Sequence, residues 1–289
     1  MRILITGARG MVGSDLVRLA KERGHDVVAA GRGDLDITQQ EGVYAYVRAL
    51  KPDCIINAAG YNLVDAAETP EGRVLAQTIN ADGPLYLAQA AEALDIPFVH
   101  MSTDYVFGGT KHEGYREDDI PDPVDSVYAK TKLAGEEGAL RAHRKTYIVR
   151  TTKIFGKKGD SPNTKGSFVS LMLRLAAEKP ELHVVDEQIG CPTYSPDLAQ
   201  AILELVEQGY PFGIYHIINS GEPVTPYGWA QEIFSAAGIA PKVQAVDASY
   251  FPSNAPRPKF AALLNTKFPA LRPRGQALQE FLANEQGLI

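Results

Sequence analysis

The chain has 289 residues, of which 45% are hydrophobic and 22% charged, with a formal net charge of −6. This composition is typical of a globular protein with one large domain or two lobes, and the negative charge without a basic cluster argues against nucleic acid as a partner. No apolar run of about 18 residues and no secretory leader is present, so we expect a cytoplasmic protein with no membrane partner and two reduced cysteines, Cys54 and Cys191.

The first predicted element is a strand over residues 2–6, followed by a glycine-rich turn and a helix over 11–23. Gly7, Gly10 and Gly13 have the spacing G-x-x-G-x-x-G. A strand, glycine turn and helix in this order are typical of a dinucleotide-binding unit, where the glycines allow a tight turn, close approach to a pyrophosphate and helix–strand packing. The helix N-terminus would face the pyrophosphate with free N–H groups.

The second predicted strand, 26–30, ends without a carboxylate and runs into Arg32. An acidic residue here commonly binds the ribose 2′-OH of NAD, whereas an arginine can bind the 2′-phosphate of NADP. The sequence therefore favours NADPH, with NADH as the alternative because Asp34 and Asp36 follow closely. The residues expected at the adenosine end are Arg9, Arg32, Asp36 and Ile37.

Strands and helices alternate onward through predicted strands 53–57, 97–102 and 146–151 and predicted helices 39–50, 70–94 and 126–143. This alternation predicts an α/β fold with a Rossmann-like, doubly wound parallel sheet. Later segments are mixed: helices at 167–177, 196–207, 226–237 and 275–284, strands at 183–185 and 213–218, and loops at 157–165 and 249–260. We expect an NADP(H)-binding domain of residues 1–155 and about 187–222, and a smaller α/β substrate lobe of about 156–186 and 223–289.

Tyr128 and Lys132 are four residues apart in a predicted helix, so they share one face. A lysine ammonium beside a phenol lowers the tyrosine pKa from about 10, which makes the tyrosine usable in proton transfer. Thr103 ends the fourth predicted strand. We expect Thr103 to hydrogen-bond a substrate carbonyl, Tyr128 to protonate the developing alkoxide, and Lys132 to hold the nicotinamide ribose and lower the Tyr128 pKa.

Two strand ends complete the predicted cofactor site, because residues 57–60 and 102–107 follow the third and fourth strands at the same edge of the sheet. With the glycine turn and the helix of Tyr128, they define the cofactor contacts outside the adenosine end. These are Gly7, Gly10, Met11, Val12, Gly13, Ala58, Ala59, Tyr61, Ser102, Tyr128 and Lys132.

These motifs together resemble the extended short-chain dehydrogenase/reductase family. Within it, the segments VDAAE (64–68), STDYVF (102–107), QIGCPT (188–193), RP (257–258) and LNT (264–266) resemble the dTDP-4-dehydrorhamnose reductases. The resemblance implies reduction by NADPH of the 4-keto group of a dTDP-linked 6-deoxyhexulose, giving dTDP-L-rhamnose. It also implies a sugar-nucleotide substrate held by Val64, Asp104, Tyr105, Lys153, Gln188 and Arg257.

The chain departs from this family pattern after the fifth strand. The pattern there is Arg-Thr-Ser-Trp, with the Trp lining the sugar pocket, whereas this chain has Thr152 and Lys153 at the last two positions. A cation in place of a flat apolar face leaves open a related 4-keto or branched-chain sugar. Some members bind a divalent metal at a dimer contact through paired carboxylates; we find no such set here and expect no metal, and a homodimer is left open.

Three other functions are weighed against this one. Dehydratases of the fold follow the Thr with Asp-Glu, but Asp104 is followed by Tyr105. Epimerases retain NAD between turnovers, whereas Arg32 favours an exchangeable NADP(H). A regulatory subunit that binds NADP without turnover is kept open by Lys153 and opposed by the intact Thr103, Tyr128 and Lys132. Structural roles are assigned to two further residues, a core position for His100 and packing for Trp229.

Overall fold

The computed structural model describes residues 1–160 and 166–285. Its centre is a six-stranded sheet in the order β2-β1-β3-β4-β5-β9, in which every pair of neighbours is parallel. The strands are β1 (Arg2–Thr6), β2 (Asp26–Ala30), β3 (Cys54–Asn57), β4 (Phe98–Thr103), β5 (Thr146–Thr151) and β9 (Gly213–His216). The chain order reverses between β1 and β3, and open parallel sheets bind ligands at the carboxyl edge beside such a point.

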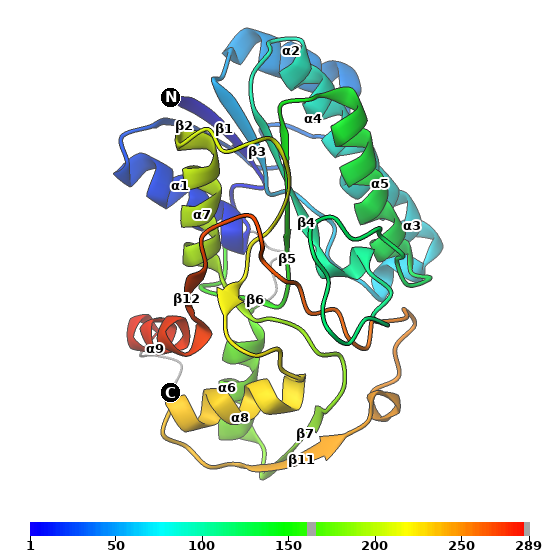
Figure 1. The fold of residues 1–289 in the computed structure, drawn as a ribbon, viewed down its shortest axis with the longest axis vertical. Helices are drawn as coiled ribbons and strands as arrows, with labels where there is room; N and C mark the ends of the chain where they lie inside the picture. Colours follow the sequence, from blue (N-terminus) through cyan, green and yellow to red (C-terminus); the bar gives the residue numbers. More distant parts are fainter. Residues whose placement is uncertain (161–165, 286–289) are drawn as a thin grey trace.

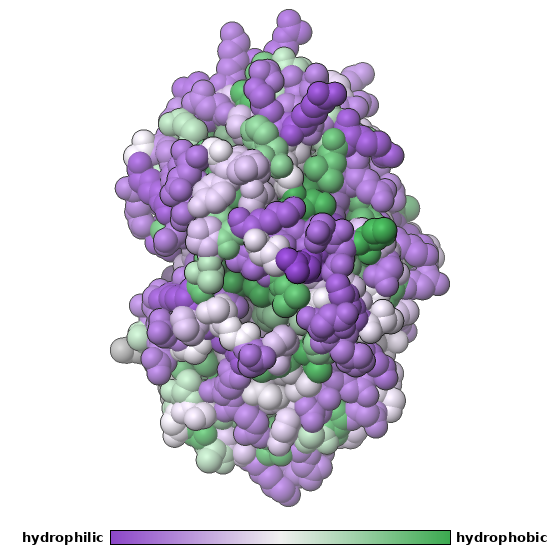
Figure 2. Space-filling view, viewed as in Figure 1, coloured by the Kyte–Doolittle hydropathy of each residue, from purple (hydrophilic) through white to green (hydrophobic). Residues whose placement is uncertain are grey.

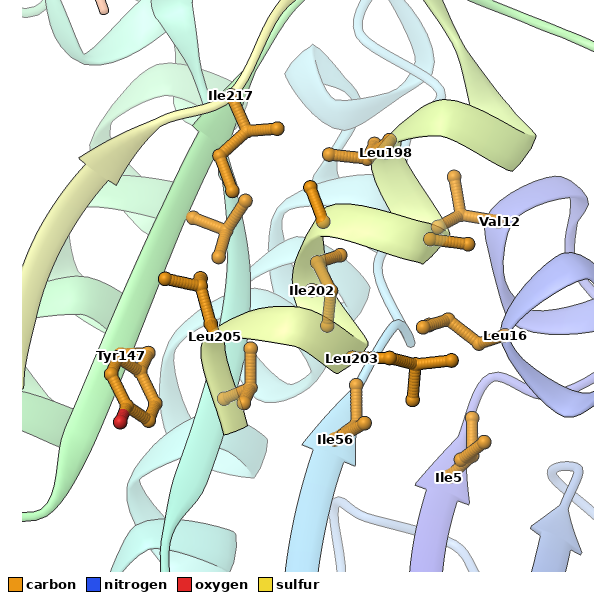
Figure 3. Close-up of a cluster of buried hydrophobic side chains, with 14 of the residues drawn as sticks. Ile5, Val12, Leu16, Ile56, Tyr147, Leu198, Ile202, Leu203, Leu205 and Ile217 are labelled. Carbon is orange, nitrogen blue, oxygen red and sulfur yellow. The ribbon is translucent and has the colours of Figure 1, made fainter. Parts of the chain in front are cut away.

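Helices cover both faces of the sheet (Figure 1). On one face lie α1 (Met11–Glu22) and α7 (Ser195–Glu207), and on the other α2 (Gln40–Leu50), α4 (Gly83–Glu92) and α5 (Val127–Ala142). In α7 the buried residues Leu198, Ile202 and Leu205 recur at helical spacing, so one apolar face is turned to the sheet. Figure 3 shows this core, in which the α7 side chains meet those of β1, β3 and α1.

A smaller group of elements lies beyond the carboxyl end of β5 (Figure 1). It contains α6 (Phe168–Glu178), α8 (Pro226–Ala236), α9 (Arg274–Asn284) and the parallel pair β7 (Glu181–Val185) and β11 (Lys242–Val246). These elements share an apolar cluster in which Trp229 is buried, as expected. Figure 2 shows a mostly hydrophilic surface with a notch at mid-height, between this group and the sheet with its helices.

Shorter elements join the two parts of the chain. The pair β6 (Ile154–Phe155) and β8 (Thr193–Tyr194) is parallel, as is the pair β10 (Asn219–Ser220) and β12 (Leu271–Pro273). Single turns of 3₁₀ helix occur at Ala66–Glu68, Asp104–Val106 and Ala248–Tyr250. Within the described part of the chain, no helix is both long and apolar enough to cross a membrane.

The longer predicted elements are confirmed, and the differences have physical causes. The expected helix over 70–94 is three consecutive segments, α3 (Pro70–Ala76), a π-helical stretch (Gln77–Asp82) and α4. Strands β6, β8, β10, β11 and β12 were not predicted, because four of them have only two or three residues and take their hydrogen bonds from distant partners. Of the expected loop over 157–165, residues 161–165 lie outside the described residues. The expected lobe boundaries stay a prediction.

Candidate active site

The glycine turn after β1 packs so closely that two of its positions require glycine. Gly7 has φ +66°, and a Cβ there would lie 2.5 Å from the backbone of Ala58. A Cβ on Gly13 would lie 2.1 Å from the Gly7 carbonyl oxygen. No side chain of the described residues caps α1 at Gly10, so the helix N-terminus keeps donors for an anionic group.

A second feature at the same edge fits a bound cofactor. The Ser102 hydroxyl is buried at the carboxyl end of β4 and has no hydrogen-bond partner among the described residues. Beside it, the segment after β3 is held by side-chain oxygens, since Asn57 accepts from the Ala59 N–H (3.1 Å) and Asn80 from the Tyr61 N–H (2.8 Å). The glycine turn, the ordered segment after β3 and the orphan hydroxyl together suit a dinucleotide.

The residues expected at the adenosine end of the cofactor lie in the segment after β2, except Arg9, which lies in the glycine turn. Arg32 is exposed, and Arg9 lies 3.8 Å from Asp34, whose carboxylate also accepts from the Gly31 N–H. Asp36 accepts hydrogen bonds from the backbone and hydroxyl of Thr38 (3.0 and 2.8 Å), while Ile37 is buried. The two arginines therefore remain available to an anion, with one carboxylate close to Arg9.

Helix α5 presents Tyr128 and Lys132 to the end of β4, where Thr103 lies. All three side chains are nearly covered, with 8%, 4% and 6% of their surface exposed for Tyr128, Lys132 and Thr103 respectively. The helix start is fixed by Glu68, which accepts from the Val127 N–H (2.8 Å), and by its own Ser126 cap. The Lys132 ammonium donates to the carbonyl oxygen of Met101 (2.6 Å), which leaves two of its three donors for other groups.

The expected lowering of the Tyr128 pKa by Lys132 is wrong for this structure. Burial raises the pKa of Tyr128, with a hydrogen bond to Thr103 opposing it and the Asp104 charge adding to it. Burial also lowers the pKa of Lys132 to about 8, against the opposing charge of Glu136. Desolvation is therefore the largest effect on the pKa of Tyr128, and the phenol keeps its proton at neutral pH.

Asp104 and Lys153 were both expected to bind substrate. Asp104 is almost fully buried, and Lys153 has a left-handed backbone conformation. Asp104 is 5% exposed, and its two carboxyl oxygens accept from the hydroxyls of Thr103 (3.0 Å) and Thr152 (2.6 Å). Lys153 has φ +44°, and its side chain passes over Gly190, where an added Cβ would lie 2.6 Å from the lysine Cε. Burial lowers the pKa of Lys153, and the Asp104 charge opposes that effect.

Four other residues were expected to bind substrate, and one of them forms an ion pair; they are Val64, Tyr105, Gln188 and Arg257. Arg257 donates to Asp65 (2.7 Å), and Asp65 also accepts from the Ser253 hydroxyl. Next to this pair is a cavity of about 200 Å³ whose lining includes Gln188, Phe251, Arg257 and Lys259. Val64 and Tyr105 pack with Tyr128. Asp65 lies in the VDAAE segment that carries the family resemblance, and the sequence analysis did not single out Phe251.

His100, expected in the core, is fully buried on β4 beside the site. Its Nδ1 lies 3.1 Å from the Asn57 amide nitrogen, and this contact joins β3 to β4. Burial lowers its pKa well below the usual value, with the Lys132 charge adding to the effect. The histidine is therefore neutral, and its position is confirmed.

Comparisons with known proteins agree with this arrangement. The family model described as RmlD substrate binding domain matches residues 1–286. The dTDP-4-dehydrorhamnose reductase of Mycolicibacterium smegmatis is 39% identical over 98% of this chain and 85% of that protein, and the spore coat polysaccharide biosynthesis protein SpsK of Bacillus subtilis is 35% identical over 97% and 96%. The crystal structure of dTDP-4-dehydrorhamnose reductase from Bacillus anthracis in complex with NADP is 35% identical, with a TM-score of 0.91 and coverage of 98% and 99%.

Proposed function

The chain belongs to the RmlD substrate binding domain family, and from that premise we propose that it reduces the 4-keto group of a dTDP-linked 6-deoxyhexulose with NADPH, converting dTDP-4-dehydrorhamnose to dTDP-L-rhamnose. The observation that carries the proposal is the hydrogen bond between Tyr128 and Thr103, with Lys132 anchored on the same strand, at the sheet edge that also holds the glycine turn. The reductase relatives support the substrate, and the NADP-bound relative supports the cofactor.

The residues suit a carbonyl reduction in which the bound nicotinamide supplies the hydride. Tyr128, whose pKa is raised by burial, is protonated and gives its proton to the oxygen that becomes negative. The Thr103 hydroxyl donates a hydrogen bond to the same oxygen. Lys132 is anchored by the Met101 carbonyl and uses its remaining donors toward the ribose and the phenol.

The same proposal assigns the binding roles. Cofactor contacts come from the glycine turn with Met11 and Val12, from Ala58, Ala59, Tyr61 and Ser102, and from Arg9, Arg32, Asp36 and Ile37. The sugar nucleotide would lie between the carboxyl edge of the sheet and the cavity beside Arg257 and Gln188. Val64, Asp104, Tyr105 and Lys153 would contact it.

The direct test follows NADPH absorbance while dTDP-4-dehydrorhamnose is generated in the same reaction. Sugar-dependent oxidation that yields dTDP-L-rhamnose supports the proposal. The half-buried residue Lys153 favours one second candidate, a reductase for a related 4-keto sugar nucleotide. A panel of such sugars identifies it, and NADPH binding with no oxidation across the panel contradicts both functions and indicates a regulatory subunit.

Replacing Arg32 by Ala tests the preference for NADPH. We expect the affinity for NADPH to fall about 10- to 100-fold, since a charge-assisted hydrogen bond contributes roughly 1.5–3 kcal/mol, while the affinity for NADH stays nearly unchanged. The measurement is nucleotide fluorescence titration with both cofactors. Arg48→Ala, at an exposed position in the last turn of α2, is the control. Equal losses for the two nucleotides would exclude a contact between Arg32 and the 2′-phosphate.

Replacing Arg257 by Ala tests whether the ion pair with Asp65 shapes the sugar-nucleotide site. We expect KM for the sugar nucleotide to rise about 10-fold or more with kcat little changed, because Arg257 lines the cavity and does not adjoin the reacting groups. Steady-state kinetics at saturating NADPH gives both constants. Arg174→Ala, which breaks an exposed pair on α6, is the control. A drop in kcat at constant KM would place Arg257 in the chemistry instead.

A further inference from the structure

Lys153 lies where the chain leaves the main sheet, between the end of β5 at Thr151 and the start of β6 at Ile154. Its φ is +44°, in the left-handed region that residues with a Cβ rarely adopt. Backbone strain of this kind persists only where the surrounding structure fixes it, and it is frequent at ligand sites. The strain therefore marks Lys153 as a candidate ligand-binding position.

The Lys153 side chain crosses Gly190 and ends close to Asp104. A Cβ on Gly190 would lie 2.6 Å from Lys153 Cε and 3.4 Å from the Thr152 hydroxyl oxygen, so these two atoms are neighbours. The Thr152 hydroxyl donates in turn to Asp104 Oδ2 (2.6 Å). Gly190 is itself fixed by two backbone hydrogen bonds with Val224 (3.1 and 2.9 Å). The far end of the lysine is thereby brought beside the carboxyl end of β4.

The Lys153 ammonium group has no partner of its own among residues 1–160 and 166–285. It forms no hydrogen bond and no ion pair there, and the residue is half-buried. Burial lowers the pKa of Lys153; the charge of Asp104 opposes this effect and the charge of Arg257 adds to it. The ammonium group is therefore within electrostatic range of Asp104, beside the reacting groups, and of Arg257, at the cavity. Its donors are unused and can bind an acceptor on a ligand.

The groups around the Lys153 ammonium limit what it can bind. A carboxylate or phosphate on the sugar would accept from Lys153 but would also face the carboxyl oxygens of Asp104, which accept hydrogen bonds themselves. An amino group would be repelled by the charges of Lys153 and Arg257. A hydroxyl group suits both neighbours, because it accepts from the ammonium group and donates to a carboxyl oxygen.

We propose that Lys153 is a specificity-determining residue that binds a ring hydroxyl of the sugar, on C2 or C3, so that this chain reduces hydroxylated 4-keto sugars and rejects their deoxy counterparts. If the C4 carbonyl lies at Thr103 and C1 leads to the cavity beside Arg257, then C2 and C3 lie between those two points. A site that hydrogen-bonds a substrate hydroxyl strongly rejects the analogue without it, because the polar groups of the site are then left unpaired. This inference rests on the proposed reductase function.

The test compares the wild type with Lys153→Met on dTDP-4-dehydrorhamnose and on its analogues without the C2 or the C3 hydroxyl. Methionine keeps the apolar stem of lysine and removes its donors. We expect wild-type kcat/KM to be about 10²-fold lower for one of the two analogues. In Lys153→Met this difference should shrink to about tenfold or less, through loss of activity on the hydroxylated sugar. The control is Lys21→Met, at an exposed position in the last turn of α1, which should keep the wild-type preference.

A structural role for Lys153 gives a different result. If Lys153→Met lowers kcat/KM for all three sugars by the same factor, or changes none of them, the inference is overturned, while turnover by the wild type leaves the reductase function standing.

Titration calorimetry of the same three sugars without NADPH gives their affinities independently of turnover. We expect the wild type to bind the hydroxylated sugar more tightly than one of the analogues, and Lys153→Met to lose most of that preference. If the wild type shows this preference but oxidises NADPH with none of the sugars, the contact is supported and the reductase function is rejected. Absence of the preference in the wild type overturns the inference whether or not the protein turns over.

Discussion

The Tyr128→Phe variant is expected to bind NADPH normally and to lose turnover by about 10² to 10⁴, the usual contribution of a positioned acid. The phenol is buried, its pKa is raised, and its ring packs at 5.3 Å, edge to face, against Tyr105, so the substitution removes one hydroxyl without disturbing the packing. The Thr103 hydroxyl and the bound cofactor remain and account for residual activity.

The measurements for this variant are kcat and KM with the 4-keto sugar nucleotide, together with a fluorescence titration of NADPH. Tyr46→Phe on α2, far along the chain from the site, serves as the control for a lost phenol hydroxyl. Turnover that equals the wild type, with cofactor binding intact, would remove Tyr128 from the proton transfer. A loss of NADPH affinity would instead indicate that the variant disturbs the cofactor site.

The Glu136→Ala variant is expected to lose about 3–5 kcal/mol of unfolding free energy, because it leaves a buried guanidinium without its partner. Arg150 and Glu136 are 1% and 2% exposed at their side chains, and they form two close contacts, Nη2–Oε2 at 2.6 Å and Nε–Oε1 at 3.0 Å. The pair joins α5 to β5. The helix that carries Tyr128 and Lys132 is thus held against the sheet by a charge pair on its buried face.

Urea unfolding of the variant and the wild type gives the difference in free energy. Glu178→Ala is the matched control, since Glu178 forms an exposed pair with Arg174, and exposed pairs contribute about 0–1 kcal/mol. A loss below about 1 kcal/mol in Glu136→Ala would mean that Arg150 acquires another partner or water when the glutamate is removed.

Much of the fold could be predicted because its signals are local. Glycine is required at positions 7 and 13 because a Cβ there would clash with backbone atoms, those of Ala58 for Gly7 and those of Gly7 for Gly13. Such positions are visible in the sequence as regularly spaced glycines. The apolar strands and the helical repeat of Leu198, Ile202 and Leu205 reflect burial on one face, which the sequence periodicity reports directly. The position of Tyr128 and Lys132 on one face of α5 follows from helical geometry alone.

What the sequence by itself determined is therefore the sheet with its covering helices, the glycine turn, and the residue types of the candidate site. Only the tertiary structure decided the pairing of β10 with β12, the ion pair between Asp65 and Arg257, and the inward turn of Asp104. The physical reason is shared by all three: hydrogen bonds between segments distant in sequence leave no local pattern. Desolvation likewise depends on what covers a group, and so burial raised the Tyr128 pKa where a neighbouring lysine alone predicted a lower one.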